Sequence, residues 1–175
     1  IFEEVYSFKN GVALVRMNGK YGLINKKGEM IVKPEFNNPI LFGDGIGIFK
    51  SDLYWGAVDY TGKVIISPDK FVKLNSFTDG LAYAEYYDQT QKRTDIVWCI
   101  MDKNKHILYQ TAEYQIDKYI GNGLFKFSKW NDQTKNTEYG LMDKTGKICI
   151  PLTANLEIEK FSGSLAMVKI GYDSI

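Results

Sequence analysis

Histidine and cysteine are scarce in this sequence, which has one histidine and two cysteines in 175 residues. The single histidine excludes metal sites built from several histidines, and a nucleophilic serine or cysteine would have to use His106 as its base. Cys99 and Cys149 are too few for a disulfide scaffold. Free cysteine packs as a small apolar residue, so we expect two buried thiols. We expect His106 to be a core or half-buried residue of a strand.

The sequence also lacks long apolar runs and an excess of one charge. No run approaches the roughly 18 apolar residues of a transmembrane helix, and no long amphipathic helix pattern occurs. The net charge of +1 argues against binding to nucleic acid or to an anionic membrane. The chain starts with Ile1 and has no signal-peptide pattern, which predicts a trimmed or excised piece of a longer protein. The compartment stays open, with the cell envelope or secretion slightly favoured over the cytoplasm.

What the sequence does contain is a repeat rich in aromatic residues and glycine. Aromatic residues make up 14% of the chain, and there are 16 glycines. The stretch from Phe8 to Phe36 recurs along the chain in imperfect copies. The copies span residues 8–36, 42–71, 77–114 and 120–151, followed by a partial copy at 161–175.

Three positions recur in one register through the four full copies. The first is an aromatic residue followed by glycine or its replacement: Tyr21-Gly22, Trp55-Gly56, Trp98-Cys99 and Tyr139-Gly140. Three residues after the glycine position stands Asn25, Asp59, Asp102 or Asp143, and three further on stands Gly28, Gly62, Lys105 or Gly146. A shared register of this length predicts one structural unit used repeatedly.

Each copy has the pattern of three short strands. In the first copy we expect strands over Gly11–Met17, Tyr21–Asn25 and Met30–Lys33. Asn18-Gly19 favours a two-residue hairpin turn, because both positions of such a turn need a positive φ. The apolar third strand of each copy is typical of a strand buried on both faces.

These residues resemble the WG repeat family, which consists of bacterial tandem repeats. The resemblance covers nearly the whole chain and rests on the aromatic-glycine pair, the turn that follows it and the apolar third strand. The chain departs from the family pattern at four positions: Cys99, Lys105, Gln110 and Ser164. The resemblance implies a β repeat used as a binding or structural module, often in multidomain bacterial proteins, and it implies no catalytic residues.

The predicted fold is an all-β, single repeat domain over residues 1–175. We expect antiparallel β-hairpin or three-stranded units that stack as a solenoid-like array. A β-propeller is the alternative, if the six-position linkers between copies supply a fourth strand and the ends close. Units of 34 residues are tight for four strands, which favours the open stack.

Two packing predictions follow from the register. The aromatic rings of the aromatic-glycine pairs, Tyr21, Trp55, Trp98 and Tyr139, are expected to be largely buried in one repeated column. Lys105 stands where the other copies have a glycine with positive φ, and lysine rarely adopts that conformation. We therefore predict a changed turn in the third copy, with Asn104 in the left-handed position.

The candidate site is formed by two expansions, which replace the two-residue turn in the third and fourth copies. They span Tyr86–Asp95 and Trp130–Thr137. Insertions in repeat arrays often form the binding face, and aromatic residues with arginine are typical of recognition hot spots. The predicted partner-binding residues are Tyr86, Tyr87, Arg93, Trp130, Asn131 and Lys135. If the units stack regularly, the two loops project together from one face; otherwise they are longer hairpins with ordinary polar loops.

The predicted function is a non-catalytic binding or scaffold module that engages a protein or a glycan, with no cofactor, no metal, no nucleic acid and no membrane insertion. A structural spacer that presents another domain is the first alternative. An enzyme with its active site in the expanded loops is a remote one. The ligand and the oligomeric state are not specified by the sequence.

Overall fold

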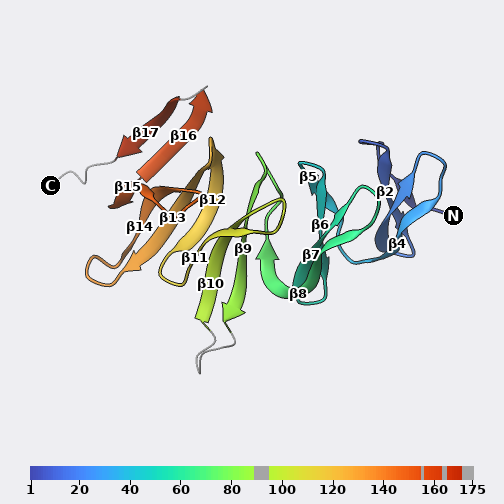
Figure 1. Cartoon of the computed structure of the whole chain (residues 1–175), viewed down its shortest axis with the longest axis horizontal. Coiled ribbons are helices and arrows are strands. Elements are labelled where there is room, and N and C mark those ends of the chain that lie inside the picture. The colour runs from blue at the N-terminus through green and yellow to red at the C-terminus, as the bar shows by residue number, and fades with distance from the viewer. Residues whose placement is uncertain (89–94, 155, 163–164, 171–175) are drawn as a thin grey trace. The chain divides into compact units, whose positions relative to one another are not determined.

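The structure, a computed structural model, describes residues 1–88, 95–154, 156–162 and 165–170, and in these residues it consists of strands and turns (Figure 1). The chain divides into two compact units, Ile1–Thr78 and Asp79–Ile175. We find no helix in the described ranges with the length and apolar character needed to cross a membrane. The chain is therefore an all-β array of antiparallel repeats, as the sequence predicts.

Unit 1 contains two antiparallel meanders, which we call modules 1 and 2. In each module, every strand pairs with the next strand in sequence. Module 1 consists of β1 (Glu4–Val5), β2 (Val12–Met17), β3 (Lys20–Asn25) and β4 (Met30–Phe36). Module 2 consists of β5 (Leu41–Gly43), β6 (Ile46–Ser51), β7 (Tyr54–Asp59) and β8 (Val64–Leu74).

Unit 2 contains modules 3 and 4 and a final hairpin, again with antiparallel neighbours. Module 3 consists of β9 (Leu81–Asp88), β10 (Asp95–Asp102) and β11 (Ile107–Thr111). Module 4 consists of β12 (Gln115–Gly121), β13 (Leu124–Asn131), β14 (Asn136–Asp143) and β15 (Ile148–Thr153). The hairpin pairs β16 (Leu156–Ser162) with β17 (Leu165–Ile170).

The linkers between copies contain strands, which corrects the expectation of three strands per copy. In module 2 the linker strand β5 pairs with β6, and in module 4 β12 pairs with β13. The linker strand β5 has only three residues and pairs with the first half of β6, Ile46–Ile48. Units of 34 residues therefore do accommodate four strands, the feature that the propeller alternative requires.

The register of the strands confirms the alignment of the copies. The aromatic residue of each pair lies at an equivalent place in the ladder, opposite Phe36, Phe71, Thr111 or Thr153. The four rings are partly buried and none is well exposed, which agrees with the predicted burial, although the most deeply buried positions belong to neighbouring residues. The reason is that each ring lies near the hairpin tip, and the residue two positions on, such as Leu23 or Ile100, takes the core position on the same face.

The third strands are covered on one face only, contrary to the prediction that they are buried on both faces. Their apolar residues alternate between buried and exposed positions, as on a strand with one wet face. The exposed fractions are 40% for Met30, 52% for Val64 and 45% for Ile148. The apolar pattern of these strands does not distinguish two buried faces from one.

The hydrophobic cores lie between successive modules inside each unit. In unit 1, Leu23 and Phe36 of module 1 pack with Phe49 and Val58 of module 2. The Phe36 and Phe49 ring centroids are 4.5 Å apart. In unit 2, Ile100 of module 3 packs with the buried residues Phe125, Phe127 and Met142 of module 4. Each module thus buries one face against its neighbour, which is how repeats without a core of their own become stable.

The turn between the second and third strands is the same in all four modules, so the predicted change at Lys105 is wrong. Lys105 has a φ of 70° and its N–H donates to the Asp102 carbonyl over 3.0 Å. Gly28 has a φ of 81° and makes the same bond to Asn25 over 3.0 Å. The Asp102 carboxylate accepts the backbone N–H groups of Asn104 and His106. These bonds hold the turn closed and keep Lys105 in the left-handed region.

The environments of His106 and of one cysteine differ from the expectation. Cys99 is a buried free thiol, as predicted, whereas Cys149 is a free thiol on the surface. Cys149 lies between Ile148 and Ile150, where the β14–β15 ladder has a register shift. The His106 side chain is 73% exposed and its Nδ1 lies 3.0 Å from Asp102 Oδ2. His106 therefore belongs to the turn and not to the core.

Candidate partner-binding surface

The two expansions lengthen their hairpins. Strands β9, β10, β13 and β14 have eight residues each, whereas β2, β3, β6 and β7 have six each. In the first expansion, Tyr87 pairs with Ile96. In the second, Trp130 pairs with Thr137. Most of the described inserted residues are therefore strand residues and not loop residues.

Tyr87 and Trp130 occupy the same position in the two lengthened hairpins. Each lies two residues beyond the partner of the repeat aromatic, which is Glu85 for Trp98 and Ser128 for Tyr139. Residues two apart on a strand share a face, so each ring extends the face that carries the repeat aromatic. Tyr87 is 43% exposed and Trp130 is 54% exposed. Unit 2 therefore presents one accessible aromatic ring from each module.

Tyr87 has an apolar neighbour that the sequence analysis did not include. Ile96 lies directly opposite it on β10 and is 37% exposed. Side chains directly opposite each other on an antiparallel pair are in contact range. The sequence could have indicated Ile96 only through the register of the β9–β10 hairpin. That register cannot be assigned without knowing where the turn lies within the first expansion. Residues 89–94 lie outside the described residues.

Tyr86 lies on the other face of the hairpin and has a structural role. Its cross-strand partner is Val97, which is buried. The Tyr86 hydroxyl donates a hydrogen bond to Gln110 Oε1 over 3.0 Å and so joins β9 to β11. Burial raises the pKa of Tyr86. The structure therefore does not place Tyr86 with Tyr87.

Asn131 and Lys135 shape the turn of the second expansion. Asn131 Oδ1 accepts the backbone N–H groups of Gln133 and Thr134, and its amide donates to Glu138 Oε1 over 2.8 Å. Lys135 has a φ of 56°, and its N–H donates to the Asn131 carbonyl over 2.9 Å. Asn131 and Lys135 together close the hairpin next to Trp130.

The indole of Trp130 is held by its own turn. Its Nε1–H donates to Asp132 Oδ1 over 3.1 Å. Asp132 also lies 3.9 Å from Lys135 Nζ, and both side chains are more than 70% exposed, so this ion pair contributes little to stability. Because the N–H of the indole is engaged within the turn, the ring faces remain as its accessible surface. This arrangement presents an apolar aromatic plane rather than a hydrogen-bond donor.

A charged cluster braces the second hairpin on the face opposite to Trp130. Lys129 Nζ lies 2.8 Å from Glu113 Oε1 and 5.4 Å from the centroid of the Tyr114 ring. The hydrogen bond to Lys129 lowers the pKa of Glu113, and the same bond raises the pKa of Lys129. Tyr114 in turn packs against Phe127, with ring centroids 5.0 Å apart. The cluster ties β13 to the turn before β12.

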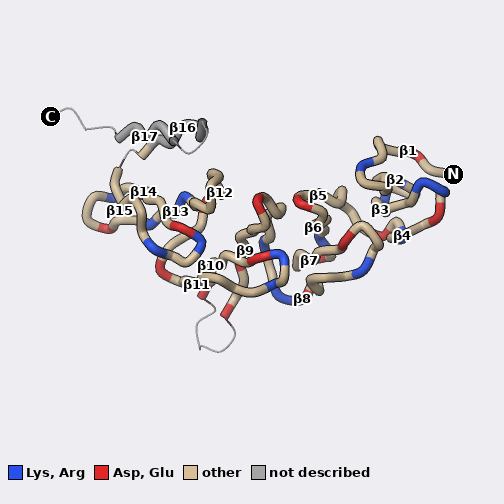
Figure 2. The backbone as a smooth tube through the Cα atoms, turned by 45° about the horizontal axis from the view of Figure 1, so that its top comes forward, with Lys and Arg blue, Asp and Glu red and all other residues tan. Residues whose placement is uncertain are grey.

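Arg93, the remaining predicted residue, lies outside the described residues. Among the residues that the structure does describe, no group of three or more histidine, cysteine, aspartate or glutamate side chains could hold a metal ion. Basic and acidic residues alternate along both units in Figure 2, without a long stretch of one sign. The chemistry of the candidate surface is therefore that of exposed aromatic and aliphatic side chains.

Comparison with known proteins gives one family. Three consecutive segments, residues 1–21, 21–52 and 55–88, match the family model described as WG containing repeat. No curated protein sequence matches the chain. The matched segments include β1–β9 and so cover modules 1 and 2 together with the first strand of module 3.

Proposed function

The chain belongs to the WG repeat family, and we propose that it is a non-catalytic binding module that engages a protein partner through the lengthened hairpins of unit 2. The observation that carries the proposal is the pair of exposed rings, Tyr87 and Trp130, at the same position of two hairpins. The unexpanded hairpins of unit 1 end before this position.

Exposed aromatic rings of this kind favour recognition. Tyrosine and tryptophan are the residues most enriched at binding hot spots, because a ring contributes a large contact area and orders few rotatable bonds. Trp130 is further pre-organised by its bond to Asp132 and by the turn that Asn131 closes. Pre-organisation lowers the entropy lost on binding. If the lengthened hairpins served only to connect their strands, neither hairpin would need an aromatic ring at this exposed position.

A protein partner fits the first hairpin better than a glycan does. Tyr87 lies beside Ile96, and the two side chains form an apolar pair without a polar group between them. Sugar rings stack on flat aromatic faces but also need hydrogen-bonding neighbours. A protein side chain with an apolar surface matches the Tyr87–Ile96 pair directly. A glycan is therefore the competing outcome of the experiment below.

The proposed absence of catalysis rests on the distribution of reactive groups. The one histidine, His106, makes its side-chain contact with Asp102 inside a turn and is 73% exposed. In the described ranges no cluster of candidate metal ligands occurs. An active site needs convergent titratable groups in a cleft, and the lengthened hairpins supply aromatic and aliphatic groups instead. A structural spacer remains the rival, and it requires no binding at Tyr87 or Trp130.

The experiment compares three proteins in quantitative pull-downs and on a glycan array. They are the wild type, the double variant Tyr87→Ala, Trp130→Ala, and the control Leu53→Ala. Leu53 is 73% exposed at the tip of the unexpanded hairpin β6–β7, so its removal tests whether any exposed apolar tip would serve. Circular dichroism and unfolding curves establish that all three proteins fold.

We expect the wild type and Leu53→Ala to retain the same protein partners and the double variant to lose them by more than about tenfold, since two aromatic hot spots are removed. Retention of partners by the double variant would remove the hairpins from the binding surface and leave the spacer alternative. Specific glycan binding that the double variant loses, without a protein partner, would overturn the choice of a protein.

A further inference from the structure

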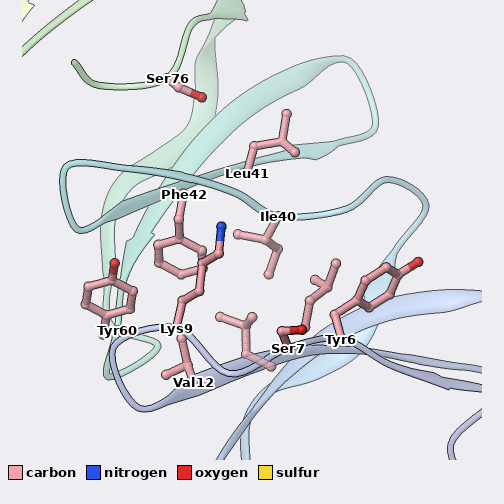
Figure 3. Close-up of a pocket in the computed structure, with 11 residues that line it drawn as sticks. Tyr6, Ser7, Lys9, Val12, Ile40, Leu41, Phe42, Tyr60 and Ser76 are labelled. Carbon is pink, nitrogen blue, oxygen red and sulfur yellow. The ribbon is translucent and has the colours of Figure 1, made fainter.

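A groove of about 590 Å³ lies between modules 1 and 2 inside unit 1 (Figure 3). Its floor and walls are apolar and come from both modules: Val12, Leu14 and Leu23 from module 1, and Ile40, Leu41 and Phe42 from module 2. The Phe42 and Tyr60 rings stack at 4.8 Å with an angle of 10° and form one end. The volume lies in the range of small-molecule sites. The hairpins proposed above belong to unit 2, so this groove is a different surface.

The groove contains one charged group. Lys9 lines it, and Figure 3 shows the Lys9 nitrogen within the ring of lining side chains. In the part of the chain that the structure describes, Lys9 has no salt bridge. No carboxylate is among the lining residues. The groove thus combines an apolar interior with a single positive charge.

The hydroxyl groups of the two lining tyrosines already have partners. Tyr6 donates to Glu4 Oε2 over 2.5 Å, and this bond raises the pKa of Tyr6 to about 12. In Figure 3 the Tyr6 hydroxyl points away from the other lining residues. Tyr60 accepts a hydrogen bond from the Asn10 amide over 2.6 Å. The two tyrosines therefore contribute mainly ring surface. The other polar groups of the lining are the hydroxyls of Ser7 and Ser76 and the ammonium of Lys9, which is the charged one and sets the polarity of a ligand.

The corresponding groove of unit 2 is filled. Tyr83 stands at the position of Leu14, and Phe125 stands at the position of Gly47. The Tyr83 hydroxyl donates to the Asp117 carbonyl over 2.9 Å, and the Tyr83 and Phe125 ring centroids are 6.3 Å apart. The pocket that remains there, about 500 Å³, is lined largely by polar residues, among them Asp79, Asn122, Asp143, Lys144 and Thr145. An open apolar groove is thus a property of unit 1 and not of the repeat.

We propose that the groove between modules 1 and 2 binds a small amphipathic carboxylate, with its apolar body on Leu14 and Phe42 and its carboxylate at Lys9. One cation without a salt bridge in a groove without carboxylates complements a single negative charge. The apolar walls complement an aromatic or aliphatic body. A single ammonium suits a carboxylate better than a multiply charged phosphate.

The test uses three probes of one shape and different charge: phenylbutyrate, phenylbutanol and phenylbutylamine. Affinities are measured by titration calorimetry, and the contact residues are mapped by NMR chemical-shift changes. For the wild type we expect saturable binding of the acid, about twofold to fivefold tighter than that of the alcohol, with the amine weakest. The shifts should concentrate on the lining residues of the groove.

Four variants locate the site. Lys9→Gln should remove the preference for the acid over the alcohol, and Leu14→Tyr, which introduces the residue found in unit 2, should weaken all three probes by more than about tenfold. Leu41 is 51% exposed at the rim, so Leu41→Glu should fold and should reverse the order to favour the amine. Lys26→Gln, in the exposed turn after β3, is the control and should change nothing.

Four results would overturn the proposal. The first is a wild type that binds no probe saturably. The second is a wild type that binds the acid and the alcohol equally. The third is a set of chemical-shift changes outside the groove. The fourth is an acid preference that survives Lys9→Gln. Leu41→Glu keeps the proposal testable if Leu14→Tyr fails to fold.

Discussion

The strand pairs β10–β11 of module 3 and β14–β15 of module 4 occupy the same place in the repeat but differ in register. In β14–β15, Tyr139 pairs with Thr153 and Leu141 with Ile150, so Gly140 lies opposite two residues in a bulge. In β10–β11 the ladder is continuous through Cys99, which pairs with Gln110, and the register shifts only further on, between Ile100 and Met101. The bulge recurs in modules 1 and 2, opposite Gly22 and Gly56. The glycine and the bulge opposite it therefore occur together, and both are absent at the Cys99 position of module 3.

The geometry at Gly140 explains this coupling. A Cβ on Gly140 would lie 2.7 Å from the carbonyl oxygen of Ile150, which the bulge turns toward it, and 2.6 Å from the Phe127 ring on the other side. In module 3 the cross-strand neighbour of Cys99 is Ala84, which leaves room for the thiol. The proline that accompanies the bulge in the other modules is replaced by Gln110. Proline belongs at bulges because it cannot donate to a regular ladder.

The largest effect that tests this comparison is expected at Gly140. Gly140→Ala should destabilise the protein by about 2–3 kcal/mol, because the methyl group overlaps with backbone and with a buried ring. Cys99→Ala, at the same position of module 3, should cost only about 1 kcal/mol, the value for a small buried truncation. Both residues belong to unit 2, so urea unfolding curves of the two variants are directly comparable.

Gly56→Ala provides the matched test in unit 1. Its Cβ would lie 2.6 Å from the Phe49 ring and 2.8 Å from the Ile66 carbonyl oxygen, as at Gly140. We expect a similar loss of stability, about 2–3 kcal/mol. Equal losses for Gly140→Ala and Cys99→Ala would show that the bulge does not impose the glycine.

The sequence predicted the features that depend on local pattern. The all-β class, the repeat register and the second-to-third strand turn follow from positions such as Tyr21, Asn25 and Gly28, whose roles are set within a few residues. The burial of the third strand was mispredicted because an apolar strand reads the same whether one or both faces are covered. The linker strands were missed because a strand as short as β5 has no periodicity to detect.

The candidate surface was predictable only in part. The expansions and their aromatic residues are visible in the sequence, and Tyr87 and Trp130 are exposed as a partner surface requires. The separation of Tyr86 from Tyr87 depends on strand alternation, which the sequence analysis did not apply within the expansion. The groove at Lys9 brings together residues from two modules, so no single copy contains its signal.

An intermediate effect on stability is expected at Lys105, where module 3 has the same turn as the other modules but lacks the glycine. Lys105→Gly should stabilise the protein by about 0.5–1 kcal/mol, because the left-handed conformation costs an L-residue about 1–2 kcal/mol and glycine loses part of that gain to entropy. The midpoint of thermal unfolding should rise by about 2–4 °C per kcal/mol for a chain of this size.

Gly28→Lys is the reciprocal variant in module 1. A Cβ on Gly28 meets nothing within 4 Å, so only the backbone strain changes. We expect a loss of about 1 kcal/mol. If Lys105→Gly and Gly28→Lys both leave the thermal midpoint unchanged, then the hydrogen bonds to the side-chain oxygen of Asp102 or Asn25, and not the φ angle, determine the stability of the turn.

The smallest effect distinguishes the turns closed by aspartate from the turn closed by asparagine. In module 2 the hydrogen bond from the Thr61 hydroxyl lowers the pKa of Asp59 below 3.8, and the backbone N–H groups of Thr61 and Lys63 add to this against the opposing effect of burial. Asp143 has the equivalent bonds and a lowered pKa. In module 1, Asn25 Oδ1 accepts the N–H groups of Lys27 and Glu29 without a titrating group.

The sign of the pH dependence follows from these lowered pKa values. A carboxyl whose folded pKa is lower than its unfolded value stabilises the protein above pH 3.8, and this stabilisation is lost as the pH falls through the folded pKa. Asp59→Asn with Asp143→Asn introduces the asparagine of module 1, so the variant should lose less thermal stability than the wild type between about pH 5 and pH 2. The control is Asn25→Asp, which should steepen the loss. Parallel pH profiles for all three proteins would mean that the turn carboxylates are hydrogen-bonded as strongly in the unfolded chain.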